Sequence, residues 1–159
     1  MVAISIAEWH LKDDWGFTEK PDQDEYTVYM KTLLVCAKGD GVLSPEERNW
    51  VLGYCAANGG GAQLVEELAA YPADDDIREL ITGQTPVAYA SRRTLVYDAL
   101  RASDADGVLD PRELAAIKRA ATELEVPEDV VDRLYDLYKQ EKAIKQARIA
   151  LVWPAGVPI

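Results

Sequence analysis

The sequence predicts an all-α protein, a single-domain bundle of about seven helices. Apolar residues recur at helical spacing along most of its 159 residues. A ten-residue motif also occurs twice, at Lys38–Glu47 and Asp104–Glu113, with six identical positions. A motif duplicated between apolar helices predicts two pseudo-symmetric repeats, each made of a helix, an acidic turn and a helix. One domain of this length can bury a sizeable core without metals or disulfides.

The first 24 residues are expected to be an irregular lead-in to a helical domain at 25–153. This segment is rich in aromatic residues and contains the only histidine, His10. One histidine cannot form a zinc site by itself, because such sites use three or four protein ligands. We therefore expect His10 at the surface or at a helix cap.

The first repeat predicts helices at about 24–37 and 45–58. Between them, an Asp-Gly pair favours a tight turn, since glycine accepts left-handed backbone angles. Ser44 is a typical N-cap, Pro45 suits the first helical position, and Glu47 completes a capping box. A Gly-Gly-Gly sequence at 59–61 then ends the helix. Without a preceding strand or a following Gly-Lys-Ser/Thr, this sequence indicates a joint and not a phosphate loop.

The remaining helices follow the same signals. Two short helices at 62–70 and 74–83 are expected to link the repeats. Thr85 and Pro86 begin a helix that is expected to reach Ala102, and cations at its start call for a carboxylate partner. After the second turn, Asp110 and Glu113 form a second capping box, which predicts a helix at 111–124.

A last, long helix is expected from Pro127 to Trp153. Its first half is acidic and its second half is basic, which complements the helix dipole. The tail at 154–159, with the end of this helix, is unusually apolar for a free chain end. We expect it to dock either on its own molecule or on a second copy, which would give a homo-oligomer.

The acidic turns also suggest a cation site. In a standard calcium loop, Asp104, Asp106, Asp110 and Glu113 would take ligand positions three, five, nine and twelve. The first position is Ala102, however, which cannot coordinate, and the first copy has only Asp40, Ser44 and Glu47 in such places. Both loops are degenerate, and the turn with its capping box explains the same residues without a metal.

The two turns could instead share one site. If they face each other, Asp40, Glu47, Asp106 and Glu113 lie close together. Two unit charges about 8 Å apart repel by roughly 2 kcal/mol at an effective dielectric of about 20. A calcium or magnesium ion, a lysine such as Lys38, or raised carboxyl pKa values must then offset the repulsion. If the turns point apart, no metal is implied.

These two Asp-Gly-Val-Leu-x-Pro-x-Glu turns, between apolar helices in a small acidic chain, resemble the tellurite-resistance TerB-like family. The N-terminal domain of DjlA-type co-chaperones belongs to the same group. The resemblance covers about 25–145. It implies a helical bundle with a cluster of acidic residues that is suspected of binding a divalent cation. Carried over to this sequence, those acids are Asp40, Glu47, Asp106 and Glu113.

Composition narrows the classes of function. A net charge of −11 argues against nucleic acid and anionic membranes as partners. The two cysteines, Cys36 and Cys55, lie on predicted apolar helix faces, where free buried thiols in the cytoplasm are favoured over a disulfide. No signal peptide and no membrane-spanning segment is expected.

The sequence carries no nucleophile elbow, phosphate loop, zinc-protease helix or dinucleotide turn. We therefore expect a non-catalytic interaction or scaffold module of a stress-response system, with an unidentified protein partner and a divalent cation at the paired turns. Two alternatives stay open. One is a purely structural scaffold whose turns only cap helices, and the other is a metal-dependent hydrolase.

Overall fold

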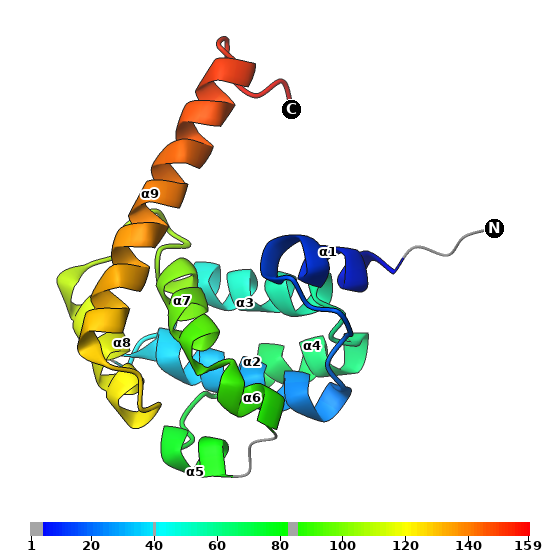
Figure 1. The fold of residues 1–159 in the computed structure, drawn as a ribbon, viewed down its shortest axis with the longest axis vertical. Coiled ribbons are helices and arrows are strands. Elements are labelled where there is room, and N and C mark those ends of the chain that lie inside the picture. Colours follow the sequence, from blue (N-terminus) through cyan, green and yellow to red (C-terminus); the bar gives the residue numbers. More distant parts are fainter. Residues whose placement is uncertain (1–4, 40, 83–85) are drawn as a thin grey trace.

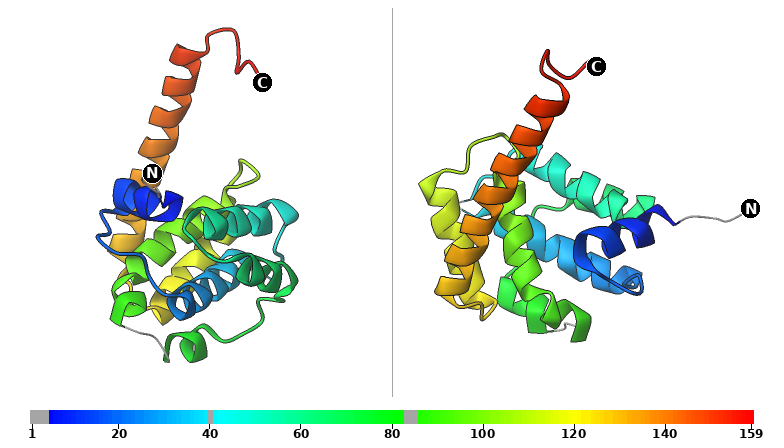
Figure 2. Two further views of the ribbon diagram at one scale, coloured as in Figure 1. Left: turned by 90° about the vertical axis from the view of Figure 1, so that its right-hand side faces the viewer. Right: turned by 45° about the horizontal axis from the view of Figure 1, so that its top comes forward.

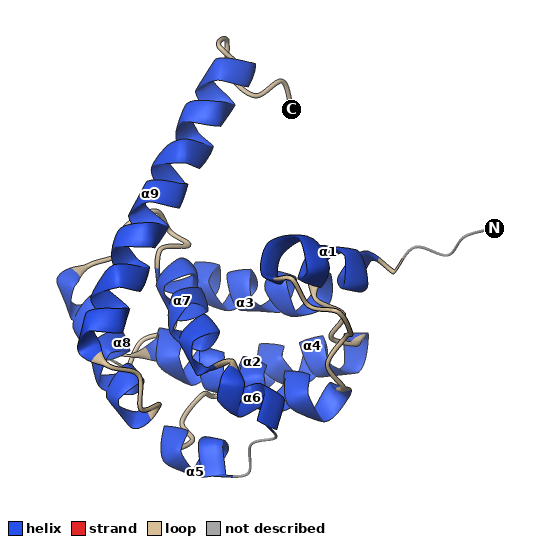
Figure 3. Cartoon of the chain, viewed as in Figure 1, coloured by secondary structure: helices blue, strands red, loops and turns tan. Residues whose placement is uncertain are grey.

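The structure, a computed structural model, describes residues 5–39, 41–82 and 86–159, and this part of the chain is built from helices without strands (Figure 3). The helices are α1 (Ile6–Trp15), α2 (Gln23–Lys38), α3 (Pro45–Ala57), α4 (Ala62–Ala70), α5 (Ile77–Thr82), α6 (Pro86–Ala90), α7 (Arg92–Ser103), α8 (Pro111–Glu123) and α9 (Glu128–Val152). The all-α, single-domain prediction is confirmed. The described residues form nine helices, however, where about seven were expected.

Helix α2 is the centre of the bundle (Figure 1). It contacts α3, α4, α5, α6, α7 and α8, and its closest association is with α7. Met30, Leu33 and Leu34 are almost completely buried on it, as expected for a helix that is apolar nearly all round. The thiols of Cys36 and Cys55 are both free and buried, which agrees with the prediction.

The lead-in is not irregular throughout, because it contains the ten-residue helix α1. The Ser5 side chain caps this helix by accepting a hydrogen bond from the Glu8 amide at 3.3 Å. Gly16 ends it in a left-handed conformation with φ of 73°. Leu11 is buried in the core. Both cap residues, Ser5 and Gly16, can be recognised in the sequence. The apolar pattern between them is weak, however, and it did not predict a helix.

The helix expected from Pro86 to Ala102 is divided at Ser91 into α6 and α7. The Ser91 hydroxyl donates to the Val87 carbonyl at 2.9 Å, a local bond that bends helices. The Arg92 guanidinium then binds the Leu124 carbonyl and the Glu125 carboxylate, each at 3.1 Å. The carboxylate partner expected near this helix start is therefore present. Thr85, the expected cap, lies outside the described residues.

Helix α9 packs on α7 and α8 with its first half and then extends beyond the rest of the molecule (Figures 1 and 2). Every residue from 143 to 159 is exposed. The apolar tail therefore does not dock on its own molecule, and the other alternative, docking on a second copy, stays a prediction. Within the described ranges, no helix is long and apolar enough to cross a membrane.

Candidate functional site

The first acidic turn connects α2 to α3 and ends in a complete capping box. The Glu47 amide donates to the Ser44 hydroxyl oxygen at 3.1 Å, and the Ser44 amide donates to the Glu47 carboxylate at 2.6 Å. Pro45 occupies the first helical position, as predicted. Only 4% of Glu47 is exposed, so this carboxylate is held inside the molecule.

The second turn connects α7 to α8 and is built in the same way. The Asp110 amide donates to the Glu113 carboxylate at 2.8 Å, and Asp110 accepts from the Glu113 amide at 3.1 Å. Asp106 accepts from the Val108 amide at 2.9 Å, and Gly107 takes a left-handed conformation with φ of 94°. The local hydrogen bonds therefore fix both the backbone of the turn and the direction of its carboxylates.

The end of the first repeat's leading helix lies directly against the helix that follows the second turn. A Cβ atom added to Gly39 would stand 2.7 Å from the Ala116 Cβ, which is closer than real Cβ atoms approach one another. Gly39 has φ of 40°. Glycine is thus needed here both for its backbone angle and for the close contact between the end of α2 and α8.

The electrostatics of Glu113 also join the two turns. Burial raises the pKa of its carboxyl, the hydrogen bond from the Asp110 backbone lowers it, and the charges of Asp110, Glu47 and Asp106 raise it further. The net pKa is raised. The charge of Glu47, in the first turn, therefore acts on Glu113 in the second.

The predicted ligands do not all lie in this acidic group. Asp104 is largely buried and accepts hydrogen bonds from the Tyr138 hydroxyl and the Lys142 ammonium of α9. Asp40 lies outside the described residues. Among the residues that are described, no three acidic, histidine or cysteine side chains form a ready-made metal site.

Lys38 does not act as a counter-charge between the turns. Its ammonium donates to the Pro72 carbonyl at 3.0 Å and also forms an ion pair with Asp74. This lysine therefore fastens the end of α2 to the segment between α4 and α5.

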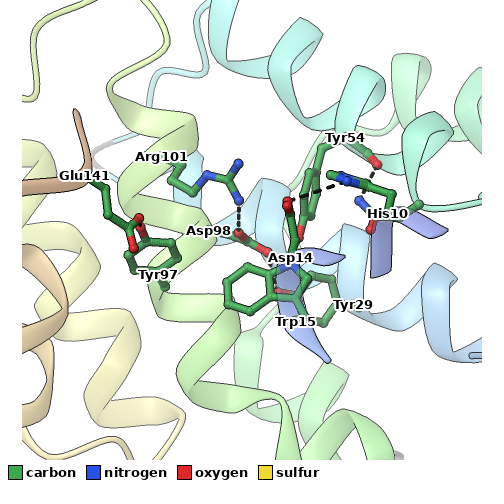
Figure 4. Close-up of polar contacts among 10 residues, drawn as sticks. His10, Asp14, Trp15, Tyr29, Tyr54, Tyr97, Asp98, Arg101 and Glu141 are labelled. Carbon is green, nitrogen blue, oxygen red and sulfur yellow. Dashed lines mark hydrogen bonds and ion pairs between the residues drawn. The ribbon is translucent and has the colours of Figure 1, made fainter. Parts of the chain in front are cut away.

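A second polar cluster, around Asp98 on α7, was not predicted from the sequence (Figure 4). Asp98 is completely buried and accepts from the Tyr29 hydroxyl at 2.7 Å and from Arg101 at 3.2 Å. Burial raises the pKa of its carboxyl, while hydrogen bonds from Tyr29, Tyr54 and Arg101 oppose that rise. One signal was available: Asp98 is a charged residue inside the apolar run Leu95–Leu100.

Aromatic side chains surround the Arg101 partner of this cluster. Its guanidinium carbon lies 5.1 Å from the Trp50 ring centre and 5.4 Å from that of Tyr54, within the range of cation–π attraction. The Trp15 indole donates to the Tyr54 hydroxyl at 3.1 Å, and thereby joins the loop end of α1 to α3 (Figure 4). His10 pairs with Asp14 at 3.6 Å on the same helix.

An open groove of about 820 Å³ runs between this cluster and α9. Its walls combine aromatic side chains with charges of both signs. The residues named in the two clusters that line it are Trp15, Trp50, Arg101, Asp104, Asp106, Tyr138 and Lys142. The groove therefore lies beside the second acidic turn and borders both polar clusters.

Comparison with solved structures gives a strong match over nearly the whole chain. A crystal structure of a tellurite resistance protein from Nostoc punctiforme superposes with a TM-score of 0.90 and is 38% identical in sequence. The alignment covers 96% of this chain and 95% of that one. No protein-family model matches the chain, and no curated protein does.

Proposed function

Since this chain belongs to the tellurite-resistance TerB-like family, we propose that it is a non-catalytic interaction module of a cytoplasmic stress-response system, with a divalent cation bound between its two acidic turns. Two observations support the proposal: the end of α2 lies against α8 at Gly39 and Ala116, and the charge of Glu47 in the first turn raises the pKa of Glu113 in the second. The Nostoc relative is named a tellurite resistance protein. The proposed role of this chain in such a stress response rests on its family alone. Free, buried Cys36 and Cys55 support a reducing compartment.

The proposed cation would offset electrostatic repulsion between carboxylates. Carboxylates that are partly removed from water and lie near one another repel, and they are stabilised by a cation or by protonation. Lys38 is engaged elsewhere, so it does not supply the charge. A set of oxygen ligands favours calcium or magnesium over softer metals.

Glu47, Asp106 and Glu113 are the described residues that would hold this ion, together with Asp40. Asp110 contributes from its capping position beside Glu113. Asp104 would reach the ion only by leaving Tyr138 and Lys142. The ion would bring the turns together and so fix the surface that a protein partner meets.

A melting experiment tests the cation. Protein treated with a chelator is melted before and after addition of calcium or magnesium, and the native chain is expected to gain melting temperature because the ion binds only the folded state. The double variant Asp106→Asn, Glu113→Gln keeps the hydrogen-bond acceptors of the turn and removes two charges, so its gain is expected to be lost.

Glu66→Gln, which removes one charge at an exposed position of α4, is the surface control and should respond like the native chain. An equal shift in all three proteins, or none in the native one, contradicts the cation. Such a result would favour a purely structural role for the turns. The two complete capping boxes support that alternative, since they use the same acids to satisfy helix N-termini.

A further inference from the structure

The outer part of α9, from residue 143 onward, is exposed throughout. Tyr138 is the last residue of this helix that packs against the core, and Lys142 makes the last contact that fastens it to α7, through Asp104. We call residues 139–152 the α9 arm. The arm extends into solvent in every view (Figures 1 and 2).

An exposed apolar stripe begins at Leu137, just before this arm, and continues along it. Leu137 is 46% exposed, Ile144 67% and Leu151 84%. Residues seven apart lie two turns apart on the same side of a helix, so these three side chains form one line with about 10 Å between neighbours. Apolar residues repeated at this interval are typical of helices that pair along a seam.

The spacing of the stripe favours a second copy of the same chain as its occupant. In a two-fold interface, if residue i meets residue j, then j also meets i. Ile144 lies midway between Leu137 and Leu151. Two antiparallel arms would therefore place Ile144 against itself and each Leu137 against Leu151 of the other copy, which completes the seam without any further protein.

Charge favours the same antiparallel arrangement. Residues 139–159 carry four basic residues and one acidic residue, a net charge of +3, whereas residues 1–138 carry 13 basic and 27 acidic residues, a net charge of −14. Antiparallel arms bring each basic arm toward the acidic body of the other copy. Parallel arms would instead set the two acidic bodies side by side, where they repel.

The charged side chains of the arm lie opposite this seam or at its edges. At about 100° per residue, Lys139 and Lys142 lie on the side of the helix opposite Ile144. Glu141 and Arg148 instead flank the seam, about 60° and about 40° from Ile144. Ala147 lies next to the seam, and its small side chain lets the helices approach. We propose that the chain forms a two-fold dimer in which two α9 arms pair in antiparallel orientation through Leu137, Ile144 and Leu151.

The oligomeric state of the full chain tests the proposal. Sedimentation equilibrium over a concentration series is expected to show a monomer–dimer equilibrium. Ile144→Glu should abolish the dimer, because the two new carboxylates would meet at the symmetry axis. Gln146→Glu adds the same charge on the opposite side of the arm, and it should leave dimerisation unchanged. A native chain that is monomeric throughout the series overturns the proposal, as does equal behaviour of the two variants.

Cross-linking tests the orientation. The two native thiols are buried, so an introduced cysteine can be oxidised selectively. A mixture of Leu137→Cys and Leu151→Cys chains should form a disulfide-linked pair, whereas Leu151→Cys alone should form little. Efficient linkage of Leu151→Cys with itself would mean parallel arms and overturn the antiparallel dimer.

A lipid surface is the competing occupant for a basic arm with an apolar stripe. Co-sedimentation with anionic phosphatidylglycerol vesicles separates it from the dimer. The native chain is expected to stay in the supernatant. A monomeric chain that pellets with vesicles, and loses this binding on Ile144→Glu substitution, would assign the stripe to lipid and overturn the proposal.

Discussion

Glu113 connects hydrogen bonding with charge at a single residue. Its carboxylate accepts from the Asp110 amide and so caps α8. Burial and the charges of Asp110, Glu47 and Asp106 nevertheless raise the pKa of the carboxyl above its ordinary value. A raised carboxyl pKa means that folding favours the protonated form. Ionised Glu113 therefore lowers stability above its folded-state pKa, and this cost disappears as the pH falls through the unfolded-state pKa.

Glu113→Gln is accordingly expected to stabilise the chelator-treated protein at neutral pH, by less than about 1 kcal/mol because the group is partly exposed. Glutamine keeps the capping acceptor and removes the charge. The advantage should shrink on acidification and vanish below the pKa of an unfolded glutamate. Urea unfolding across a pH series measures it. The expected stability difference is that of Glu113→Gln minus that of the native chain. A difference that is smaller at neutral pH than at acid pH contradicts this account.

Tyr29 makes a second prediction at the scale of single residues. Its hydroxyl donates to the fully buried Asp98, and loss of one donor leaves a buried carboxylate less satisfied. Tyr29→Phe is expected to cost about 1–3 kcal/mol of stability. Tyr135→Phe, on a half-buried tyrosine of α9, should change stability by less than about 0.5 kcal/mol. Similar losses for both variants in urea unfolding would show that the Asp98 hydrogen bond is not the cause.

At the scale of elements, the contact between the end of α2 and α8 depends on two small residues, Gly39 and Ala116. A side chain at Gly39 would meet the Ala116 Cβ at 2.7 Å. Gly107 in the second turn also has a positive φ, of 94°, but open space surrounds it. Substitutions at the two glycines can therefore distinguish the effect of backbone strain from the effect of close packing.

Gly39→Ala is expected to destabilise the protein more than Gly107→Ala, because strain of about 1–2 kcal/mol is common to both and a core-like clash adds about 1–3 kcal/mol only at Gly39. Ala116→Gly alone should cost about 1 kcal/mol as a glycine within a helix. The double variant Gly39→Ala, Ala116→Gly should recover part of the loss. Strictly additive effects in thermal unfolding would mean that the close contact does not limit the site.

The capping boxes give the other prediction at this scale. Asp110 accepts from the amides of Arg112 and Glu113 at 2.6 and 3.1 Å. Asp110→Ala should therefore cost about 1 kcal/mol, the usual contribution of an N-cap. Asp110→Asn or Asp110→Ser should retain most of the stability, since both side chains also cap helices. An Asp110→Ser variant as unstable as Asp110→Ala in urea would exclude capping as the role of this residue.

At the scale of the whole molecule, the largest contrast in charge lies between the acidic body and the basic arm. No described residue of α9 after Tyr138 belongs to the core, so we expect the apolar stripe to be covered from outside the molecule. If two arms pair, folding is coupled to association, and the melting temperature of the full chain should rise with protein concentration.

A chain ending at residue 143 is expected to keep its helical content and to melt at a temperature that does not depend on concentration. Differential scanning calorimetry at several concentrations compares it with the full chain. Loss of folding in the shortened chain would show that the arm stabilises its own molecule, contrary to its exposed position. Equal concentration dependence in both chains would place the dimer contact elsewhere.

The sequence by itself determined the all-α class, both capping boxes and most helix positions, because these depend on apolar spacing and on short-range hydrogen bonds within one turn. The acids Glu47, Asp110 and Glu113 were identified from their positions in those boxes. Asp104 was proposed from its place in a calcium loop, yet it turns to α9, since Tyr138 and Lys142 approach it from a distant part of the chain.

Only the tertiary structure decided which charged groups meet. Three features depend on how helices far apart in sequence pack. They are the clustering of Tyr29, Asp98 and Arg101, the contact of Gly39 with Ala116, and the projection of α9. Electrostatic influence and side-chain contact depend on distance in space. Periodicity gives the buried face of each helix, but it does not say which neighbour covers that face.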